Sequence, residues 1–192
     1  FNDEDIVALD LATGNIAIYL DGSDIGLTTS AADIDAFTIL EDGSILMSFL
    51  GAPFVSGLGT VDDSDIIRFI PTSLGTTTSG VFSIYFDGSD VGLSNNSEDI
   101  DALALLSDGR ILISTTGSFS VPGASGNDED LIAFTPTSLG GFTSGSWAIY
   151  FDGSDVGLGT SSSEDVNSVK VDEDGNIYLS TIGNYAVSGL NG

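Results

Sequence analysis

An acidic phrase occurs three times in this chain, and its side chains are of the kind that bind hard metal ions. It reads FDGSDVGL at residues 86–93 and 151–158, and LDGSDIGL at 20–27. Carboxylate and carbonyl oxygens are the ligands of Ca²⁺, which takes roughly six to eight of them. Only six of the 29 acidic residues are Glu. The short Asp side chain suits both tight turns and such metal sites.

The chemistry predicted from these residues is calcium binding at three recurring positions. One position is the second Asp of the phrase, another is an acid or amide a short loop later, and the third is the Asp that opens each repeated segment. The candidate metal ligands are Asp24, Asp90 and Asp155; Asp35, Asp101 and Asn167; and Asp5, Asp33, Asp65, Asp99, Asp130 and Asp165. We expect Asp24 with Asp35, and Asp90 with Asp101, to bracket a loop that folds into an oxygen cage.

The same Asp residues are also good turn formers, so a purely structural role stays open. Asp side chains accept hydrogen bonds from nearby backbone N–H groups, and Gly tolerates positive φ angles. Adaptation to high salt would also explain the acidity, although it predicts more Glu. The formal net charge of −26 favours calcium, because crowded carboxylates with few protein counter-ions repel one another.

The composition excludes several other kinds of chemistry. The chain has no Cys and no His, so it offers no thiol nucleophile, imidazole base, disulfide or ordinary zinc site. It contains no G-x-S-x-G phrase, phosphate-binding loop or dinucleotide fingerprint. Carboxylate pairs remain as acid–base groups, but a catalytic pair is needed once and not in every repeat. We therefore expect no enzymatic activity.

Charge and hydropathy also limit the partners. Three basic residues stand against 29 acidic ones, which disfavours nucleic acid and anionic lipid because both require clustered Lys or Arg. No apolar run approaches the roughly 20 residues of a membrane span, so no membrane insertion is expected. The chain begins at Phe1 without a Met, and we interpret it as a processed product or a piece of something longer.

The chain is interpreted as one repeat domain over residues 1–192. Six segments resemble one another, alternate between two types and so form three pairs. Each segment opens with an Asp and an apolar residue, and then has two apolar runs around a turn. The segments span residues 3–27, 32–58, 62–93, 98–123, 128–158 and 164–190.

Each segment is predicted to be a β-hairpin, and no helical periodicity is found. The Asp-Gly turns within 41–44, 107–110 and 172–176 are strong hairpin signals. Pro71 and Pro136 are expected to end their strands, because proline cannot donate to a ladder. The runs IDALALL and SILMSF are apolar on both faces, which predicts sheets that are packed on both sides.

Two such hairpins make four strands, the size of one β-propeller blade. The phrases DGRILIST (108–115) and DGNIYLST (174–181) resemble the inner hairpins of propeller-type repeats in secreted and cell-surface bacterial proteins. The resemblance spans nearly the whole chain. It implies an all-β, propeller-like fold with three four-stranded blades in pseudo-threefold symmetry. A β-trefoil, which also arranges six hairpins about a threefold axis, is the alternative.

The two ends of the chain are in circular register with the repeat. Joined, the terminal sequences VSGLNG and FNDEDIVAL reproduce the internal junction VPGASGNDEDLIAF with one insertion. The last hairpin is therefore expected to pair with the first and complete a split blade. Such pairing would close three blades within one chain, join two chains into six blades, or build an open fibre.

These features together predict a non-enzymatic structural or adhesive module of an extracellular or cell-surface protein. It would be stabilised by Ca²⁺ and would self-associate through its terminal hairpins into a homo-oligomer or filament. The alternative is a calcium-dependent, lectin-like module that binds a glycan or a surface protein, since repeated shallow sites gain avidity.

Overall fold

The computed structural model describes residues 1–187 and 190–191 of the chain, and over these residues the fold is all-β. It contains eighteen β-strands and five short 3-10 helices. All pairings between the strands are antiparallel. The all-β prediction is thus confirmed. None of the helices in this part of the chain is long and apolar enough to cross a membrane.

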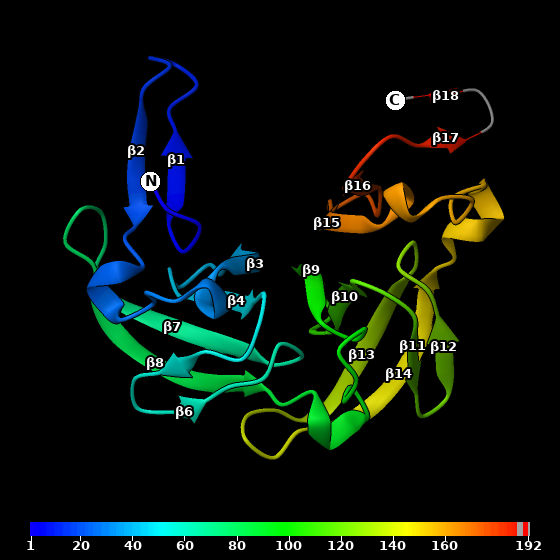
Figure 1. The fold of residues 1–192 in the computed structure, drawn as a ribbon, viewed down its shortest axis with the longest axis horizontal. Coiled ribbons are helices and arrows are strands. Elements are labelled where there is room, and N and C mark those ends of the chain that lie inside the picture. Colours follow the sequence, from blue (N-terminus) through cyan, green and yellow to red (C-terminus); the bar gives the residue numbers. More distant parts are fainter. Residues whose placement is uncertain (188–189, 192) are drawn as a thin grey trace.

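Two four-stranded sheets with the same connectivity form the centre of the molecule (Figure 1). The first sheet has the order β3-β4-β7-β8 and the second the order β9-β10-β13-β14. The strands of the first sheet are β3 (Ile34–Ile39), β4 (Ile45–Phe49), β7 (Ile66–Ser73) and β8 (Ser79–Phe86). Those of the second are β9 (Ile100–Leu105), β10 (Ile111–Thr115), β13 (Leu131–Ser138) and β14 (Ser144–Phe151).

Each end of the chain carries a hairpin that forms a two-stranded sheet by itself. Strand β1 (Ile6–Leu9) pairs with β2 (Ile16–Leu20), and β15 (Val166–Val171) pairs with β16 (Ile177–Thr181). Within the described residues these two terminal hairpins do not pair with each other, and they lie apart in Figure 1. The third four-stranded sheet expected from the circular register is therefore not formed inside this chain.

Smaller elements connect these hairpins. The acidic phrase forms the 3-10 helices η1, η3 and η4 after β2, β8 and β14, and short hairpins follow the inner strand pairs. The helices are η1 (Ser23–Ile25), η2 (Ser30–Ala32), η3 (Ser89–Val91), η4 (Gly153–Val156) and η5 (Ser162–Glu164). The short strands are β5 (Phe54–Val55), β6 (Gly59–Thr60), β11 (Phe119–Val121), β12 (Ala124–Gly126), β17 (Ala186–Val187) and β18 (Leu190–Asn191).

Apolar clusters fill the spaces between neighbouring sheets, so the central strands are buried on both faces. Strand β4 is buried at every position and β9 at all but the last, as their two-sided apolar sequences predict. The cluster between the two large sheets includes Phe86, Phe134 and Trp147. The Phe86 and Phe134 ring centroids lie 5.1 Å apart at an interplanar angle of 75°, a favourable edge-to-face arrangement.

Pro71 and Pro136 do not end their strands, and this prediction is wrong. Strand β7 continues through Pro71, which lies opposite Gly80 of β8. On the other side of β7, pairing with β4 stops at Phe69. The proline therefore lies where no β4 residue requires its N–H, and a register irregularity follows it. Pro136 occupies the equivalent place in the second sheet.

Candidate functional site

The acidic phrase at 86–93 forms a hydrogen-bonded clasp between the two large sheets. The backbone N–H of Thr143, in the β13–β14 loop, donates to Asp90 Oδ2 at 2.8 Å. In return, the N–H of Asp87 donates to Thr143 Oγ1 at 2.9 Å. The N–H of Gly140 also donates to the Tyr85 carbonyl at 2.8 Å. Asp90 therefore joins one sheet to the next.

The same clasp occurs once more, and a third copy of the phrase has no such partner. The N–H of Thr78 donates to Asp24 Oδ2 at 2.8 Å, which joins the β1–β2 hairpin to the first sheet. The third phrase supplies Asp155, whose side chain makes no hydrogen bond within the described part of the chain. In the circular order of the repeats, the turn that would follow the third phrase is that of the first hairpin, at 10–15. This turn is too short to offer the loop that Thr78 and Thr143 occupy.

The Asp residues that open the outer hairpins hold local backbone groups. Asp65 accepts the N–H of Asp62 at 2.9 Å and that of Gly88 at 3.0 Å. A Cβ on Gly88 would lie 2.3 Å from the Ser64 carbonyl oxygen, so this close approach requires glycine. Asp5 and Asp130 make the equivalent pairs of bonds. Both carboxylate oxygens of these three residues are engaged in shaping the chain.

The inner strands bring a second set of candidate ligands together. Strands β3, β9 and β15 lie in the middle of the molecule (Figure 1), and Asp35, Asp101 and Asn167 line a cavity of about 180 Å³ among them. Asp24 lines a different cavity. The structure therefore groups Asp35 with its counterparts in the other repeats and not with Asp24.

The Asp residues that open the inner strands lie near the carboxylate of the preceding inner strand. Asp99 opens β9, and burial, followed by the charges of Asp35 and Asp63, raises its pKa to about 8. The equivalent Asp165 opens β15, and burial raises its pKa as well. Asp33 opens β3, where the preceding inner strand is absent, and it is only half-buried.

Asp101 and Asp165 form a carboxyl pair at the junction of β9 and β15. Burial and the charge of Asp165 raise the pKa of Asp101 to about 8. Ser114 Oγ also donates to Asp101 Oδ1 at 2.8 Å. On β15 the third repeat has an amide at the position equivalent to Asp101, and Ser180 Oγ donates to Asn167 Oδ1 at 2.9 Å.

Three buried carboxylate oxygens have no hydrogen-bond partner, and all belong to the inner set. They are Asp35 Oδ2, Asp99 Oδ1 and Asp165 Oδ1. In the described residues no group of three or more His, Cys, Asp or Glu side chains already has the spacing of a metal site. The sequence prediction did not name Asp63, because its role depends on the spatial approach of the loop before β7 to β9.

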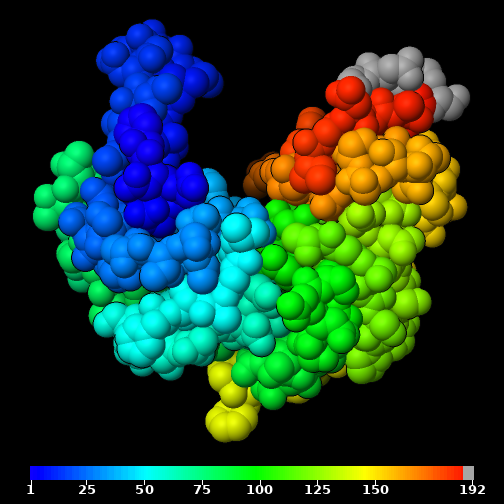
Figure 2. Space-filling view, viewed as in Figure 1, coloured from blue at the N-terminus to red at the C-terminus, as the bar shows by residue number. Residues whose placement is uncertain are grey.

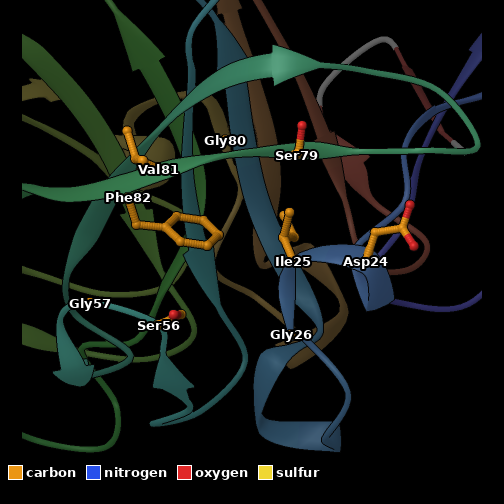
Figure 3. A pocket seen from close by; sticks show the side chains of 9 residues that line it. All are labelled: Asp24, Ile25, Gly26, Ser56, Gly57, Ser79, Gly80, Val81 and Phe82. Atoms are coloured by element: carbon orange, nitrogen blue, oxygen red, sulfur yellow. The ribbon is translucent and has the colours of Figure 1, made fainter.

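The first repeat contains a cavity of about 650 Å³ (Figure 3). Asp24, Gly26, Ser56 and Phe82 are among its lining residues, and a Cβ on Gly26 would meet nothing within 4 Å.

In the next repeat, the corresponding space is filled by larger side chains. A Cβ on the equivalent Gly92 would lie 2.8 Å from Pro122 Cδ. Trp147 stands where the first repeat has Phe82, and its Nε1 donates to the Val91 carbonyl at 3.0 Å. The Phe–Trp and Ser–Pro differences between repeats are the sequence signal of this cavity.

An apolar groove of about 260 Å³ lies beside the outer edge of β16. Phe151, Val156, Leu158, Leu179, Tyr185 and Val187 line it, with Ser180 and Thr181. In the second sheet the equivalent residues belong to one buried cluster with Ile132, Phe134 and Trp147 of β13 and β14. Among the described residues no such strands follow β16, so the groove is open.

The β1–β2 hairpin has no strands covering it, and its apolar side chains are exposed. The exposed fractions are 44% for Val7, 54% for Leu9 and 57% for Ile16, whereas their counterparts Ile132, Phe134 and Trp147 are at 0%, 0% and 8%. Figure 2 shows this hairpin projecting from the body, across an open gap from the segment that carries β15 to β17. Within the described residues, each terminal hairpin thus lacks a partner hairpin. The outer hairpin β1–β2 has no inner hairpin beside it, and the inner hairpin β15–β16 has no outer hairpin beside it.

The fold and these sites define an all-β chain of repeated antiparallel hairpins. No protein-family model matches it, and no curated protein matches it.

Several solved structures are similar in part. Two are of virginiamycin B lyase from Staphylococcus aureus, one catalytically inactive (H270A) with quinupristin and one substituted with selenomethionine. They cover 93% and 94% of this chain, with 16% identity in each case and TM-scores of 0.42 and 0.44. The chain spans 42% and 57% of those chains. Another is the extracellular domain of a protein described as a one-component system from B. thetaiotaomicron, with 14% identity, a TM-score of 0.36, and coverage of 92% of this chain and 24% of that one. The three-blade propeller and the β-trefoil both stay predictions.

Proposed function

We propose that this protein is a non-enzymatic structural repeat module that joins to a second copy through its terminal hairpins. The observation that supports this function is the match between the open groove beside β16 and the exposed side chains of β1–β2. An extracellular or cell-surface location remains part of the proposal, on the resemblance of the hairpin phrases.

The shapes of the internal junctions specify how the two copies would fit. In both complete sheets, the third strand pairs with the edge of the inner hairpin and places two apolar residues over it. A second copy of β1 would place Val7 and Leu9 in the same way, with Ile16 of β2 behind them. These side chains would fill the groove that Leu179 and Phe151 border. Burial of three aliphatic side chains is worth roughly 1.5–3 kcal/mol each before the costs of association.

The register of the contact follows from the same template. Leu112 lies opposite Ala133, and Leu46 lies opposite Arg68. By the repeat, Tyr178 of one copy would lie opposite Ala8 of the other. The free backbone groups along β16 and β1 would then form ladder hydrogen bonds, which removes two exposed sheet edges.

The expected product is a closed ring of two chains. The six repeated hairpins of each chain, twelve in the dimer, would give six four-stranded units, within the roughly four to eight blades of known propellers, whereas closure of one chain would give only three. A head-to-tail contact that does not close would instead produce a filament.

Cross-linking across the proposed register tests this function. The chain has no Cys, so Ala8→Cys with Tyr178→Cys supplies the only two thiols. Under mild oxidation we expect a covalent dimer in high yield at micromolar protein concentration. The control is Ala8→Cys with Leu179→Cys, because a one-residue slip places the two side chains on opposite faces. A ladder of larger species supports an open assembly, whereas a monomer-only disulfide or no cross-link overturns the proposal.

Self-association without cross-linking provides a second measurement. Light scattering of the unmodified chain is expected to show a concentration-dependent rise to twice the monomer mass. Leu9→Asp places a charge in the contact and is expected to keep the chain monomeric. Leu11→Asp is the matched control, because Leu11 is exposed and lies beyond β1. An equal loss of association in both variants would show that added charge, and not the contact, is responsible.

The alternative function is a lectin-like module, and the cavity in Figure 3 supports it. This cavity combines an aromatic ring, Phe82, with the Asp24 carboxylate, and both groups are typical of sugar sites. Screening of the chain on a glycan array tests this function. Phe82→Trp is expected to abolish any specific binding, because Trp147 fills the equivalent space in the next repeat. Binding that survives this substitution places the ligand elsewhere.

A further inference from the structure

We infer that a divalent cation of the calcium type binds at the junction of β3 and β9, between the carboxylates of Asp35, Asp63 and Asp99. This site is independent of the terminal contact, because none of the three residues lies in the terminal hairpins β1–β2 and β15–β16.

The backbone brings the three residues together from separate elements. Asp35 is on β3, and Asp99 directly precedes β9. Asp63 lies in the loop before β7, and its carbonyl accepts the N–H of Ile100 at 3.2 Å. Asp35 of β3 lines one cavity with Asp101 and Ala102 of β9, and burial, followed by the charges of Asp35 and Asp63, raises the pKa of Asp99.

Two oxygen atoms at this junction lack any hydrogen-bond donor. Asp99 is 6% exposed, and its Oδ1 has no partner. Asp35 Oδ2 is also buried without a partner. A buried acceptor left unsatisfied loses its hydration with no return, and a carboxylate loses more than a neutral group. Each of these two atoms therefore requires a proton or a cation.

Protein cations do not supply that charge. In the described residues, the ion pairs are Arg68 with Asp42 and Arg110 with Asp108, and neither includes a residue of this junction. Burial and neighbouring carboxylates raise the pKa values of Asp35, Asp63 and Asp99. A bound cation would offset the repulsion among these three carboxylates.

The chemistry of the ligands selects the ion. All the donors are oxygens, which suits Ca²⁺ and Mg²⁺ and not softer metals. Because no three acids already have metal-binding spacing, the side chains must rotate around the ion. Ca²⁺ accepts such irregular geometry, whereas Mg²⁺ requires near-octahedral ligands.

The second junction is the internal comparison. At that junction Ser114 Oγ donates to Asp101 Oδ1 at 2.8 Å. One buried oxygen there, Asp165 Oδ1, lacks a partner, against two at the first junction. We therefore assign the cation to the first junction.

The test is thermal unfolding of the chelator-treated chain, with CaCl₂, MgCl₂ or EDTA added. In the wild type, millimolar Ca²⁺ is expected to raise Tm by several degrees more than Mg²⁺. Asp99→Asn is expected to raise Tm in EDTA, because it removes a buried charge, and to abolish the gain from Ca²⁺. Asp165→Asn makes the same change at the equivalent position and should retain that gain.

Calorimetric titration gives the stoichiometry, which is expected to be one Ca²⁺ per chain in the wild type and none in Asp99→Asn. The inference is overturned if Ca²⁺ leaves the wild-type Tm unchanged, or if Asp99→Asn gains as much as the wild type. The titration is repeated in the Leu9→Asp variant, which separates metal binding from self-association. Calcium binding by this monomeric variant supports the site whether or not the terminal contact exists.

Discussion

The second large sheet and the two terminal hairpins have closely similar sequences but opposite burial. Phe134 of β13 is fully buried against Phe86 and Trp147. Its counterpart Leu9 of β1 is more than half exposed. The local hairpin structure is the same in both places, with Phe134 opposite Trp147 and Leu9 opposite Ile16. Burial in this chain is therefore set by the neighbouring repeat and not by the hairpin itself.

The two inner junctions show a similar contrast. Asp35 and Asp99 leave two buried oxygens without partners, whereas the second junction has one such oxygen, on Asp165, and its Asp101 accepts a hydrogen bond from Ser114. The repeated pair of acids thus has different hydrogen-bond partners at the two junctions. Substitutions at matched positions separate the contribution of a residue to stability from the contribution of its neighbours.

The largest expected effect follows from removing the aromatic ring of Phe134 from the second large sheet. Phe134→Ala is expected to lower the free energy of unfolding by about 3–5 kcal/mol, because it leaves a cavity among Phe86 and Trp147. Leu9→Ala is expected to lower it by less than about 1 kcal/mol in dilute solution, since that side chain is already in water. Urea denaturation of both variants measures the difference. Equal losses would mean that Leu9 is buried in the isolated chain, contrary to the comparison.

A pH series tests the charge at the junctions in the absence of metal. Burial raises the pKa of Asp99 and Asp101 to about 8, whereas an unfolded Asp titrates near 4. The folded state therefore binds more protons than the unfolded state between these values, and stability falls as pH rises from about 4 to about 8.

In EDTA we expect Tm to fall by at least about 5 °C between pH 5 and pH 9, a loss of roughly 1–3 kcal/mol. Asp101→Asn removes one of the two titrating groups and is expected to flatten this dependence. The exposed Asp10→Asn is the control and should leave it unchanged. A Tm that rises over the same range would show that these carboxyls are ionised at low pH in the folded chain.

Much of the local structure was predictable because it depends on neighbouring residues in the sequence. The Asp-Gly turns form as predicted, with positive φ at Gly43, Gly109 and Gly175. The two-sided apolar strands β4 and β9 are buried as expected. The error at Pro71 arose because its effect depends on which side of β7 has a partner, and that side is not visible in the sequence.

The sites were less predictable because they form between repeats. The sequence paired Asp24 with Asp35 by their short separation, but the chain directs Asp24 to the loop at Thr78 and Asp35 to the central cavity. Asp63 was missed for the same reason. At position 167 the third repeat has Asn where the other two have Asp, and this residue lies on β15, the last of the three inner strands that the structure describes.

The smallest expected effect separates a clasp that is made from one that is not. Asp90→Ala leaves the N–H of Thr143 without its acceptor at a partly buried site, and this is expected to lower the free energy of unfolding by about 1–2 kcal/mol. Asp155→Ala makes the same change in the third phrase and is expected to alter stability by less than about 0.5 kcal/mol. Urea denaturation at low protein concentration, where the chain is monomeric, measures both.

Because the short turn of β1–β2 offers no equivalent of Thr143, Asp155→Ala should stay neutral even at concentrations where two copies associate. A loss of stability for Asp155→Ala only at high concentration would mean that a partner loop other than residues 10–15 reaches the third phrase, and the register proposed for the terminal contact would then be wrong.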